Sequence, residues 1–350
     1  LKGDSFTVEV PSWRATKDVT IKADIIEEIT RIYGYDNFEI HTTRTPLYPI
    51  RMDAVKSDEE KIKDILVKRY SLHEVHSYVW AYNDEQKALG IPVEENVKLA
   101  NATNPNIETI RKSMIPTQLC QVKSNTGFAP DFGIFEIGRV VDGLNSDNKC
   151  NEKKMLAITL FSKTKNIREL YIGLRDMLAV IADDLKHKEL TFEETAAVHS
   201  YEHPVNLNKI ILDGTTIGTM AIAHPVVSKK IDKKANIVFA EIDVNKLASV
   251  SSAGIAYSEP SKFPTMTYDL SLILGKDMYF GKLKQCWTSV DCDILKNTKI
   301  VDTYDTELIH SITVRFEFSS NERTLSMEEV QAVMDKVMEN LKNAGVKLRA

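Results

Sequence analysis

The hydrophobic pattern of residues 258–350 constrains the fold of this chain more than any other feature. Residues 268–274 and 312–318 place apolar side chains at every second position, as expected for strands with one buried face. Ser326 and Glu329 form a capping box that begins a helix with apolar residues at helical spacing. The predicted order is a strand at 268–274, a helix at 280–290, strands at 294–304 and 312–318, a helix from Ser326 and an edge strand at 346–348. This βαββαβ order predicts a ferredoxin-like domain.

Residues 42–250 predict a larger α+β domain. Short strands follow one another and are joined largely by turns, which favours an antiparallel sheet over a doubly wound one. Asp213 and Gly214 mark one of these turns as a hairpin. Small residues at 251–257 predict a linker to the last domain. We expect helices at 56–70 and 169–185, and strands at 75–80, 156–161, 210–212, 217–222 and 237–242.

Residues 1–41 have the pattern of the end of a small domain. Residues 6–10 alternate as a strand that stops at Pro11, and an isoleucine stripe predicts a helix over 25–33 that Gly34 ends. The first residue is Leu1 rather than Met, so we expect the chain to have been cut out of a longer protein.

Composition excludes several classes of protein. The chain has 350 residues, of which 43% are hydrophobic and 27% charged, as in ordinary globular proteins and unlike disordered or fibrous ones. Four cysteines without a CxxC pair argue against a zinc ribbon and suit a reducing cytoplasm. No apolar run approaches the roughly 18 residues of a membrane helix. The net charge of −5 points to no nucleic-acid partner, and residues 258–350 carry 12 Lys and Arg against 14 Asp and Glu. RNA binding there would depend on local clustering.

Four carboxylates lie close together near the start of the chain, those of Asp18, Asp24, Glu27 and Glu28. Positions 24, 27 and 28 share one helical face, and Asp18 can fold back towards it. Hard oxygen ligands without His or Cys suit Mg²⁺. Alternatively, Asp24 and Glu27 cap the helix and complement its dipole, and Lys17, Lys22 or Arg31 offset the charges.

Motifs along the whole chain resemble those of one family. The first group is Val10–Asp18 (VPSWRATKD), Asp24–Ile29 (DIIEEI) and Arg31–Asp36 (RIYGYD). These are similar to the B-five domain of the bacterial phenylalanyl-tRNA synthetase beta subunit. The middle group is Asn104-Pro105, Ile110–Ser113 (IRKS) and Phe135–Arg139 (FEIGR), which resembles the catalytic-like core of that subunit. The last group is Ser261–Pro264 (SKFP), Asp269–Leu272, Arg323–Leu325 and Leu348-Arg349, which resembles the ferredoxin-fold anticodon-binding domain.

The resemblance implies a C-terminal portion of such a beta subunit. Its fold would be the end of a winged-helix-like domain (1–41), a non-catalytic class II synthetase-like antiparallel core (42–250), a linker (251–257) and an anticodon-binding domain (258–350). The family's alpha subunit binds ATP and phenylalanine, so no catalytic residue is expected here. The family's editing domains lie upstream of residue 1. The sequence agrees with this expectation. A class II active site needs an Arg at a Gly-rich strand–helix junction to hold ATP phosphates, and the one superficial candidate, Gly173-Leu174-Arg175, falls inside a predicted amphipathic helix.

The resemblance also implies partners and ligands. The partners would be the alpha subunit, tRNA(Phe) and a second beta subunit in a heterotetramer, with neither a membrane nor DNA, and the location would be cytoplasmic. Mg²⁺ would be held by Asp18, Asp24, Glu27 and Glu28, which match the family's metal ligands one by one. ATP would enter only through the alpha subunit.

Five basic residues and one aromatic residue of the last domain are the candidates for RNA contact. They are Lys262, Phe263, Arg315, Arg323, Lys347 and Arg349. Ordinary solvated surface is the alternative for each. Tyr268 and His310 stand where the family has Arg and Lys, and the turn at 305–308 is acidic. These departures motivate a second hypothesis, a paralogue that uses the same folds to bind another protein or RNA. A free-standing ligase is a third, which we do not expect.

Other chemistry-bearing residues predict structural roles. His199, His203 and His224 could suggest metal or acid–base chemistry. His203-Pro204 and His224-Pro225, however, resemble turn positions of the family's core that have no catalytic role. Trp13, Trp80 and Trp287 predict core or interface anchors.

Overall fold

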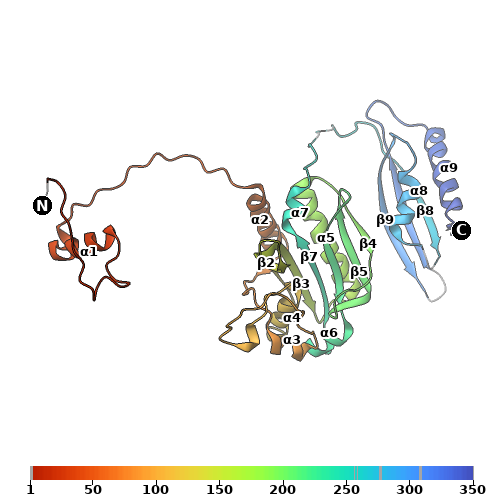
Figure 1. Cartoon of the computed structure of the whole chain (residues 1–350). Coiled ribbons are helices and arrows are strands. Elements are labelled where there is room, and N and C mark those ends of the chain that lie inside the picture. Colours follow the sequence, from red (N-terminus) through yellow and green to blue (C-terminus); the bar gives the residue numbers. More distant parts are fainter. Residues whose placement is uncertain (1–2, 256, 258, 276–277, 307–309, 350) are drawn as a thin grey trace. The chain divides into compact units, whose positions relative to one another are not determined.

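The structure is a computed structural model that describes residues 3–255, 257, 259–275, 278–306 and 310–349. The chain divides into two compact units. One contains the residues up to Met177 together with Phe192–Ser249, and the other contains Leu178–Thr191 and the residues from Val250 onward. Each is described by itself (Figure 1).

The first segment is built around helix α1 (Lys22–Tyr33), followed by the 3-10 turn η1 (Tyr35–Asn37). The helix begins three residues before the predicted start, because the Asp24 carboxylate accepts hydrogen bonds from the backbone N–H groups of Thr20 and Ile21. Gly34 ends it at a φ of +94°. The predicted strand at 6–10 is wrong. These residues belong to no sheet of the described chain, and a strand needs a hydrogen-bonded neighbour.

A seven-stranded sheet of described residues has the order β1-β2-β3-β7-β6-β5-β4 and belongs to the larger unit except for the first two residues of β4. Its recorded pairings are antiparallel, as predicted, except that β1 and β2 are parallel. Asp213 and Gly214 both have positive φ, +50° and +74°, which confirms the predicted hairpin turn. The strands are β1 (His73–Glu74), β2 (Asp131–Leu144), β3 (Cys150–Ser162), β4 (Leu190–Glu194), β5 (Glu202–Leu212), β6 (Thr215–Ala223) and β7 (Asn236–Asp243).

Helices and turns connect these strands. The buried side chains of Met114, Leu119, Phe161 and Phe239 belong to one core between helix and sheet. The elements are α2 (Ala54–Asp64), its π-helical continuation η2 (Ile65–Arg69), α3 (Asn83–Leu89), η3 (Pro105–Ile107), α4 (Ile115–Ser124), α5 (Ile167–Lys186), α6 (Pro225–Ile231) and α7 (Val244–Ser249).

The strand predicted at 75–80 is largely absent. His73 and Glu74 pair with β2, and Trp80 forms one isolated bridge to Ile110. Between them the backbone is held by separate bonds, such as that from the Arg111 N–H to the Val79 carbonyl (2.9 Å). Residues 75–80 therefore have the alternating pattern of a strand but form separate hydrogen bonds instead of a continuous ladder.

The second unit has a four-stranded sheet of described residues with the order β11-β8-β10-β9. Numbered along the unit, this is 4-1-3-2, and with two helices it confirms the ferredoxin-like prediction. Buried side chains of the sheet, including Leu272 and Phe316, pack against Trp287 and Met334 of the helices. The elements are β8 (Met266–Leu274), α8 (Phe280–Thr288), β9 (Leu295–Asp305), β10 (His310–Phe318), α9 (Met327–Asn343) and β11 (Lys347–Leu348).

The capping box of α9 is confirmed. The Ser326 hydroxyl accepts from the Glu329 N–H (3.3 Å), and the Glu329 carboxylate accepts from the Ser326 N–H (2.9 Å). The hydrogen bond from Arg323, followed by that from the Ser326 N–H, lowers the pKa of Glu329 to about 2.

The described helices include none that is both long enough and apolar enough to cross a membrane.

Replacing Phe316 by Ala tests the core of the second unit. The Phe316 side chain is fully buried and meets the Trp287 ring edge-on, with centroids 5.4 Å apart. We expect Phe316→Ala to lower the free energy of unfolding of this unit by about 3–5 kcal/mol, measured by denaturant titration. Met327→Ala, at a side chain that is 75% exposed, is the control and should change it by less than about 0.5 kcal/mol. Equal effects would contradict this description of the core.

Candidate functional site

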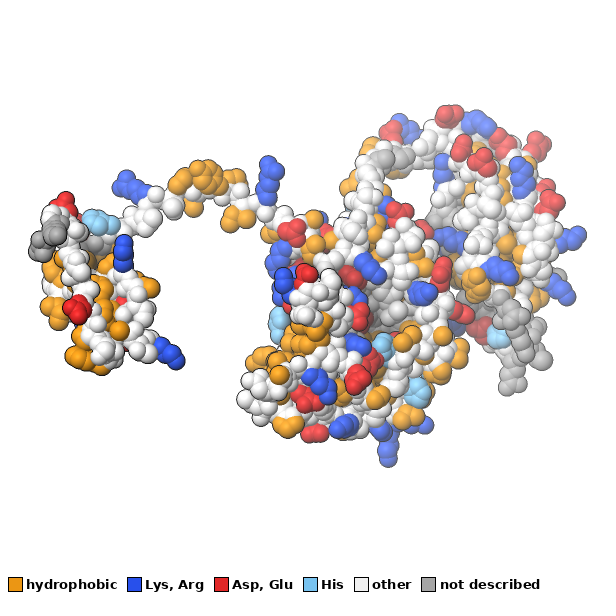
Figure 2. All heavy atoms as spheres, in the orientation of Figure 1, with side chains coloured by type: hydrophobic (Ala, Val, Ile, Leu, Met, Phe, Trp, Pro, Cys, Tyr) orange, Lys and Arg blue, Asp and Glu red, His pale blue; other side chains and the backbone are white. Residues whose placement is uncertain are grey.

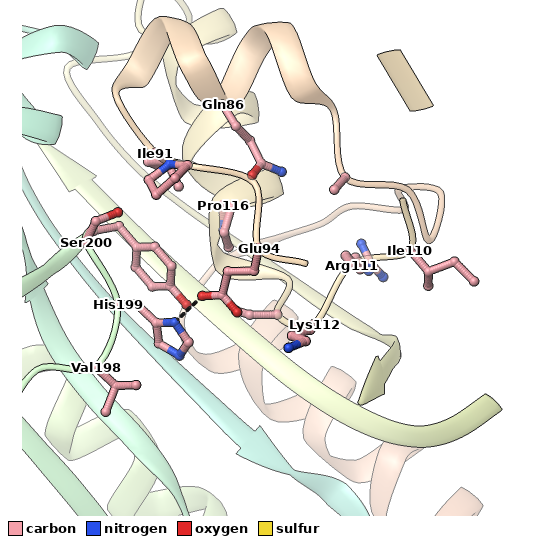
Figure 3. A pocket seen from close by; sticks show the side chains of 14 residues that line it. Gln86, Ile91, Glu94, Ile110, Arg111, Lys112, Pro116, Val198, His199 and Ser200 are labelled. Atoms are coloured by element: carbon pink, nitrogen blue, oxygen red, sulfur yellow. Dashed lines mark hydrogen bonds and ion pairs between the residues drawn. The ribbon is translucent and has the colours of Figure 1, made fainter. Parts of the chain in front are cut away.

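A cavity of about 320 Å³ opens in the larger unit (Figure 3). Its walls come from α3 and the segment after it, from the segment that leads into α4, and from the residues before β5. Gln86 of α3 is buried, and in Figure 3 its side-chain amide is directed between Pro116 and Glu94. The lining residues are Ala81, Gln86, Ile91, Pro92, Glu94, Ile110, Arg111, Lys112, Ser113, Pro116, Val198, His199, Ser200 and Tyr201.

One lining residue of this cavity, Arg111, belongs to a buried ion pair. The Arg111 guanidinium donates to the Glu136 carboxylate (3.0 Å), to the Ser77 hydroxyl (2.6 Å) and to the Arg139 carbonyl (3.1 Å). The Ser77 hydroxyl donates in turn to Glu136 (2.6 Å). Both charged side chains are only 2% exposed. The network therefore ties the segment before α4 to β2, and its charges are satisfied inside the protein.

A second polar group lines the same cavity. His199 pairs with Glu94, as Figure 3 shows, and its ring stacks on that of Tyr201 with centroids 5.0 Å apart. Burial raises the pKa of Tyr201 and also that of Glu241, whose carboxylate accepts from the Met114 N–H (2.8 Å). Burial thus favours the neutral form of both groups.

His203, His224 and residues 173–175 have structural roles. His203 Nδ1 accepts from the Val205 and Asn206 N–H groups, although His203 lies within β5 rather than in a turn. His224 caps α6 by accepting from the Val226 N–H. Residues 173–175 lie in the middle of α5, as predicted, where Leu174 is fully buried. No phosphate-binding strand–helix junction is formed there.

In the second unit, three of the six RNA candidates share one face of the sheet. The helices cover the face that carries Leu272 and Phe316. Arg315 stands opposite Asp269, and Lys347 opposite Ile273, on the other face. Arg349 follows Lys347, and its guanidinium lies 4.6 Å from the centre of the Tyr304 ring. The predicted period of β10 is confirmed, since its large apolar side chains are buried and Arg315 points away from them.

The other three candidates lie near the opposite end of β8. Lys262 and Phe263 precede that strand, and Ser261 beside them donates to the Ser320 carbonyl (2.6 Å). Arg323 follows in the same loop and forms an ion pair with Glu329. The structure thus separates the six residues into two groups.

Acidic partners neutralise much of this basic surface. Two hydrogen bonds of 2.7 Å join Arg315 to Asp269, which raises the pKa of Arg315 and lowers that of Asp269. His310 pairs with Asp305 (3.0 Å), and Lys262 lies 3.5 Å from Glu259. By contrast, Lys347 is exposed and has no ion pair with any residue that the structure describes. Of the acidic turn at 305–308, Glu307 and Leu308 lie outside the described residues.

The four carboxylates near the start of the chain are already engaged. Asp18 and Glu28 both bind Arg14 at 2.8 Å, which lowers the pKa of each. Glu27 pairs with Arg31 at 2.8 Å. The Asp24 carboxylate turns to the Thr20 and Ile21 N–H groups, which lower its pKa.

This arrangement does not fit a metal ion. No three His, Cys, Asp or Glu side chains of the described chain are gathered as a metal requires. Arg14 binds two of the four predicted ligands, Asp18 and Glu28. The assignment of Mg²⁺ to Asp18, Asp24, Glu27 and Glu28 therefore stays a prediction from the sequence.

Comparison with known families matches three successive parts of the chain. Residues 1–35 match the tRNA synthetase B5 domain, and residues 261–349 match the ferredoxin-fold anticodon binding domain. Residues 42–244, more than half of the chain, match the phenylalanyl-tRNA synthetase beta chain CLM domain. The chain belongs to the phenylalanyl-tRNA synthetase beta-chain family.

Curated relatives agree with this family. A phenylalanine–tRNA ligase beta subunit of Staphylococcus haemolyticus is 28% identical over 364 aligned residues, covering 100% of this chain and 44% of the relative. The corresponding subunit of Bacillus subtilis is 27% identical and covers 97% of this chain and 43% of the relative. That of Solibacter usitatus is 24% identical, with 98% and 44% covered. The chain thus spans less than half the length of these beta subunits.

Two contacts of this beta-chain portion could not be foreseen from local sequence. Arg14 and Glu28 are 14 positions apart, and Arg111 and Glu136 are 25 apart. The available signal was the presence of both Arg111 and Glu136 in the motifs IRKS and FEIGR that resemble the beta-chain family. Their pairing supplies a structural reason for those motifs.

Breaking the buried pair should destabilise the larger unit. We expect Arg111→Met to lower the free energy of unfolding by about 3–5 kcal/mol, because it leaves Glu136 charged and buried without its partner. The double variant Arg111→Met/Glu136→Gln should recover part of the loss. Thermal and denaturant unfolding measure both. The single variant Glu136→Gln completes the comparison. If the double variant loses as much free energy of unfolding as the two single variants together, the pair has no coupling.

Removing Arg14 should raise the carboxyl pKa values around it. Asp18 and Glu28 have lowered pKa values in the folded chain, so they stabilise it above their unfolded pKa and lose this effect as pH falls. We expect Arg14→Gln to raise both pKa values in a carbon-13 NMR titration and to reduce the loss of stability on acidification. Lys17→Gln is the control and should leave both titrations unchanged.

Proposed function

We propose that this chain is the C-terminal portion of a phenylalanine–tRNA ligase beta subunit that positions tRNA(Phe) for charging by a catalytic alpha subunit. The three family matches follow one another along the chain, and the relatives align with nearly all of it. This agreement is the observation that carries the proposal. The reaction of the whole enzyme would join phenylalanine to tRNA(Phe) with ATP and magnesium, and ATP would be bound by the alpha subunit.

The proposed division of labour assigns this chain no bond-making residue. The large antiparallel sheet would be a class II synthetase-like core, and residues 1–41 the end of a winged-helix-like domain. The charged groups beside the cavity support this assignment, because Arg111, Glu136 and Ser77 bind one another. The chain would act in the cytoplasm, in a heterotetramer with a second beta subunit.

The uncovered face of the second sheet is the proposed place of tRNA contact. Arg315, Lys347 and Arg349 share that face, and Lys347 is exposed and has no ion pair with a described residue. A sheet with one free face can accept single-stranded or stem RNA. Arg315 is held by Asp269 and is therefore positioned rather than free.

The internal neutralisation of basic residues is the observation behind the alternative function, which the family matches do not favour. The Arg315–Asp269, Arg323–Glu329 and His310–Asp305 pairs reduce the positive charge offered to RNA. A paralogue that binds another protein or RNA would show the same feature. Co-purification separates the two functions, because a true beta-chain portion should form a stable complex with an alpha subunit.

Reconstitution with an alpha subunit tests the main proposal. We expect the assembled protein to charge tRNA(Phe), and a chain shortened to residues 1–257 to keep phenylalanine-dependent ATP–pyrophosphate exchange while losing most tRNA charging. Pyrophosphate exchange by the chain without an alpha subunit, or the absence of any complex with one, would overturn the proposal.

Reversing the charge of Lys347 tests the proposed RNA face. We expect Lys347→Glu to raise the Kd for tRNA(Phe) about five- to tenfold at about 0.1 M salt and to reduce the slope of log Kd against log salt by about 1. Lys336→Glu, an equal charge change at an exposed position of α9, is the matched control and should have less than a twofold effect. Filter binding of the reconstituted protein gives both values, and equal effects would indicate bulk charge only.

A further inference from the structure

A cluster of lysines gathers at one end of the large sheet. Four of the six residues from 229 to 234 are lysines, and two more follow the end of β3. Figure 2 shows basic side chains projecting from the large-sheet body below α6 as Figure 1 places it. We call this group the lysine cluster, and its members are Lys163, Lys165, Lys229, Lys230, Lys233 and Lys234.

Contacts between the two turns show that the cluster is one surface. The Lys163 ammonium reaches the Asp232 carboxylate (2.9 Å) and the Thr126 carbonyl (3.1 Å). The Lys165 carbonyl accepts from the Asn236 side chain (2.9 Å), at the start of β7. Strands β3 and β7 are neighbours, with Ser162 opposite Asn236, so both lysine-bearing turns leave the sheet at the same end.

Helix α6 brings the remaining two lysines to this end. Lys229 and Lys230 occupy its last turn, and α6 contacts α3 and α4. A Cβ atom at Gly90 would collide with the Lys230 ammonium, so that ammonium lies against the C-terminal end of α3. Lys229, Lys233 and Lys234 are exposed.

The cluster keeps most of its charge available. Its two acidic neighbours are already engaged, Asp131 by the Ser162 and Thr164 hydroxyls and Asp232 by Lys163 and the Lys234 N–H. Within the described chain, the five lysines other than Lys163 have no ion pair. The whole chain has a net charge of −5, so a concentration of unpaired ammonium groups here runs against its general balance.

We propose that the lysine cluster binds the phosphate backbone of RNA, as a contact surface separate from the sheet face of the second unit. It rests on the proposed function in taking tRNA as the RNA. Lysine ammonium groups on flexible stems suit repeated phosphates and read no base sequence. Ile231, the apolar residue within the run from Lys229 to Lys234, is buried, and Val226 at the start of α6 is the exposed aliphatic side chain of that helix.

One exposed aromatic ring borders the cluster. Phe128 is 66% exposed and lies two residues from Thr126, which binds Lys163. Its edge contacts Phe132, with ring centres 6.2 Å apart. An exposed aromatic ring close to a bound RNA backbone can stack on an unpaired base, which favours RNA as the ligand.

Charge reversal at two lysines tests the proposal in the chain reconstituted with an alpha subunit. We expect Lys229→Glu/Lys233→Glu to weaken binding of a tRNA(Phe) transcript about 10- to 30-fold at about 0.1 M salt. The slope of log Kd against log salt should fall by about 2. Lys61→Glu/Lys246→Glu makes the same charge change on α2 and α7, where α7 leaves the other end of β7, and should change the Kd by less than threefold. Equal melting temperatures exclude misfolding as the cause.

Two further measurements separate the possible outcomes. Equal weakening by both double variants, or no weakening by the first, overturns the proposal. Binding to phosphatidylserine vesicles that depends on Lys229 and Lys233, without such dependence for RNA, also overturns it and indicates a membrane surface. Lys347→Glu is measured alongside. If Lys347→Glu has no effect while Lys229→Glu/Lys233→Glu weakens RNA binding, the proposed sheet-face contact is wrong and the lysine cluster is supported. If Lys347→Glu alone weakens RNA binding, only the lysine cluster is rejected.

Discussion

The buried Arg111–Glu136 pair is the constraint on which the architecture of the larger unit depends. Two charges that are 2% exposed are tolerable only if their hydrogen bonds are complete, so Ser77 and the Arg139 carbonyl must also stay in place. This requirement fixes the segment before α4 on β2, beside the polar wall of the cavity. The Arg111 guanidinium is thereby held by groups of the protein itself.

The lysine cluster differs from the other charged groups of the chain in how its charge is balanced. Around the sheet of the second unit, Arg315 and Arg323 each have a carboxylate partner, so an incoming phosphate would have to compete with Asp269 or Glu329. Near the start of the chain Arg14 neutralises two carboxylates in the same manner. The lysine cluster is the contrast, because its own acidic neighbours are already engaged. Attraction over a distance is therefore stronger at the cluster than at residues whose fields cancel nearby.

The sequence predicted features that depend on near neighbours along the chain. The period of β10, the capping box at Ser326 and the hairpin at Asp213 each follow from a few adjacent residues and agree with the structure. The strands at 6–10 and 75–80 failed because an alternating pattern does not show whether a partner strand exists. The carboxylate group near residue 24 was found, but its partner Arg14 was missed. That contact depends on how the chain folds back, and local spacing carries no such information.

The same distinction explains why the lysine cluster was overlooked in the sequence. The run from Lys229 to Lys234 is visible, but alone it is an ordinary charged helix end followed by a turn. Only the antiparallel pairing of β3 with β7 adds Lys163 and Lys165 to it, and only the engagement of Asp232 by Lys163 leaves the rest unpaired. The carboxylate of Asp232 is thus occupied by Lys163 and does not neutralise the other lysines. Because Asp232 and Lys163 lie in different turns, the contact that joins the two turns also leaves the remaining lysines without this carboxylate as a partner.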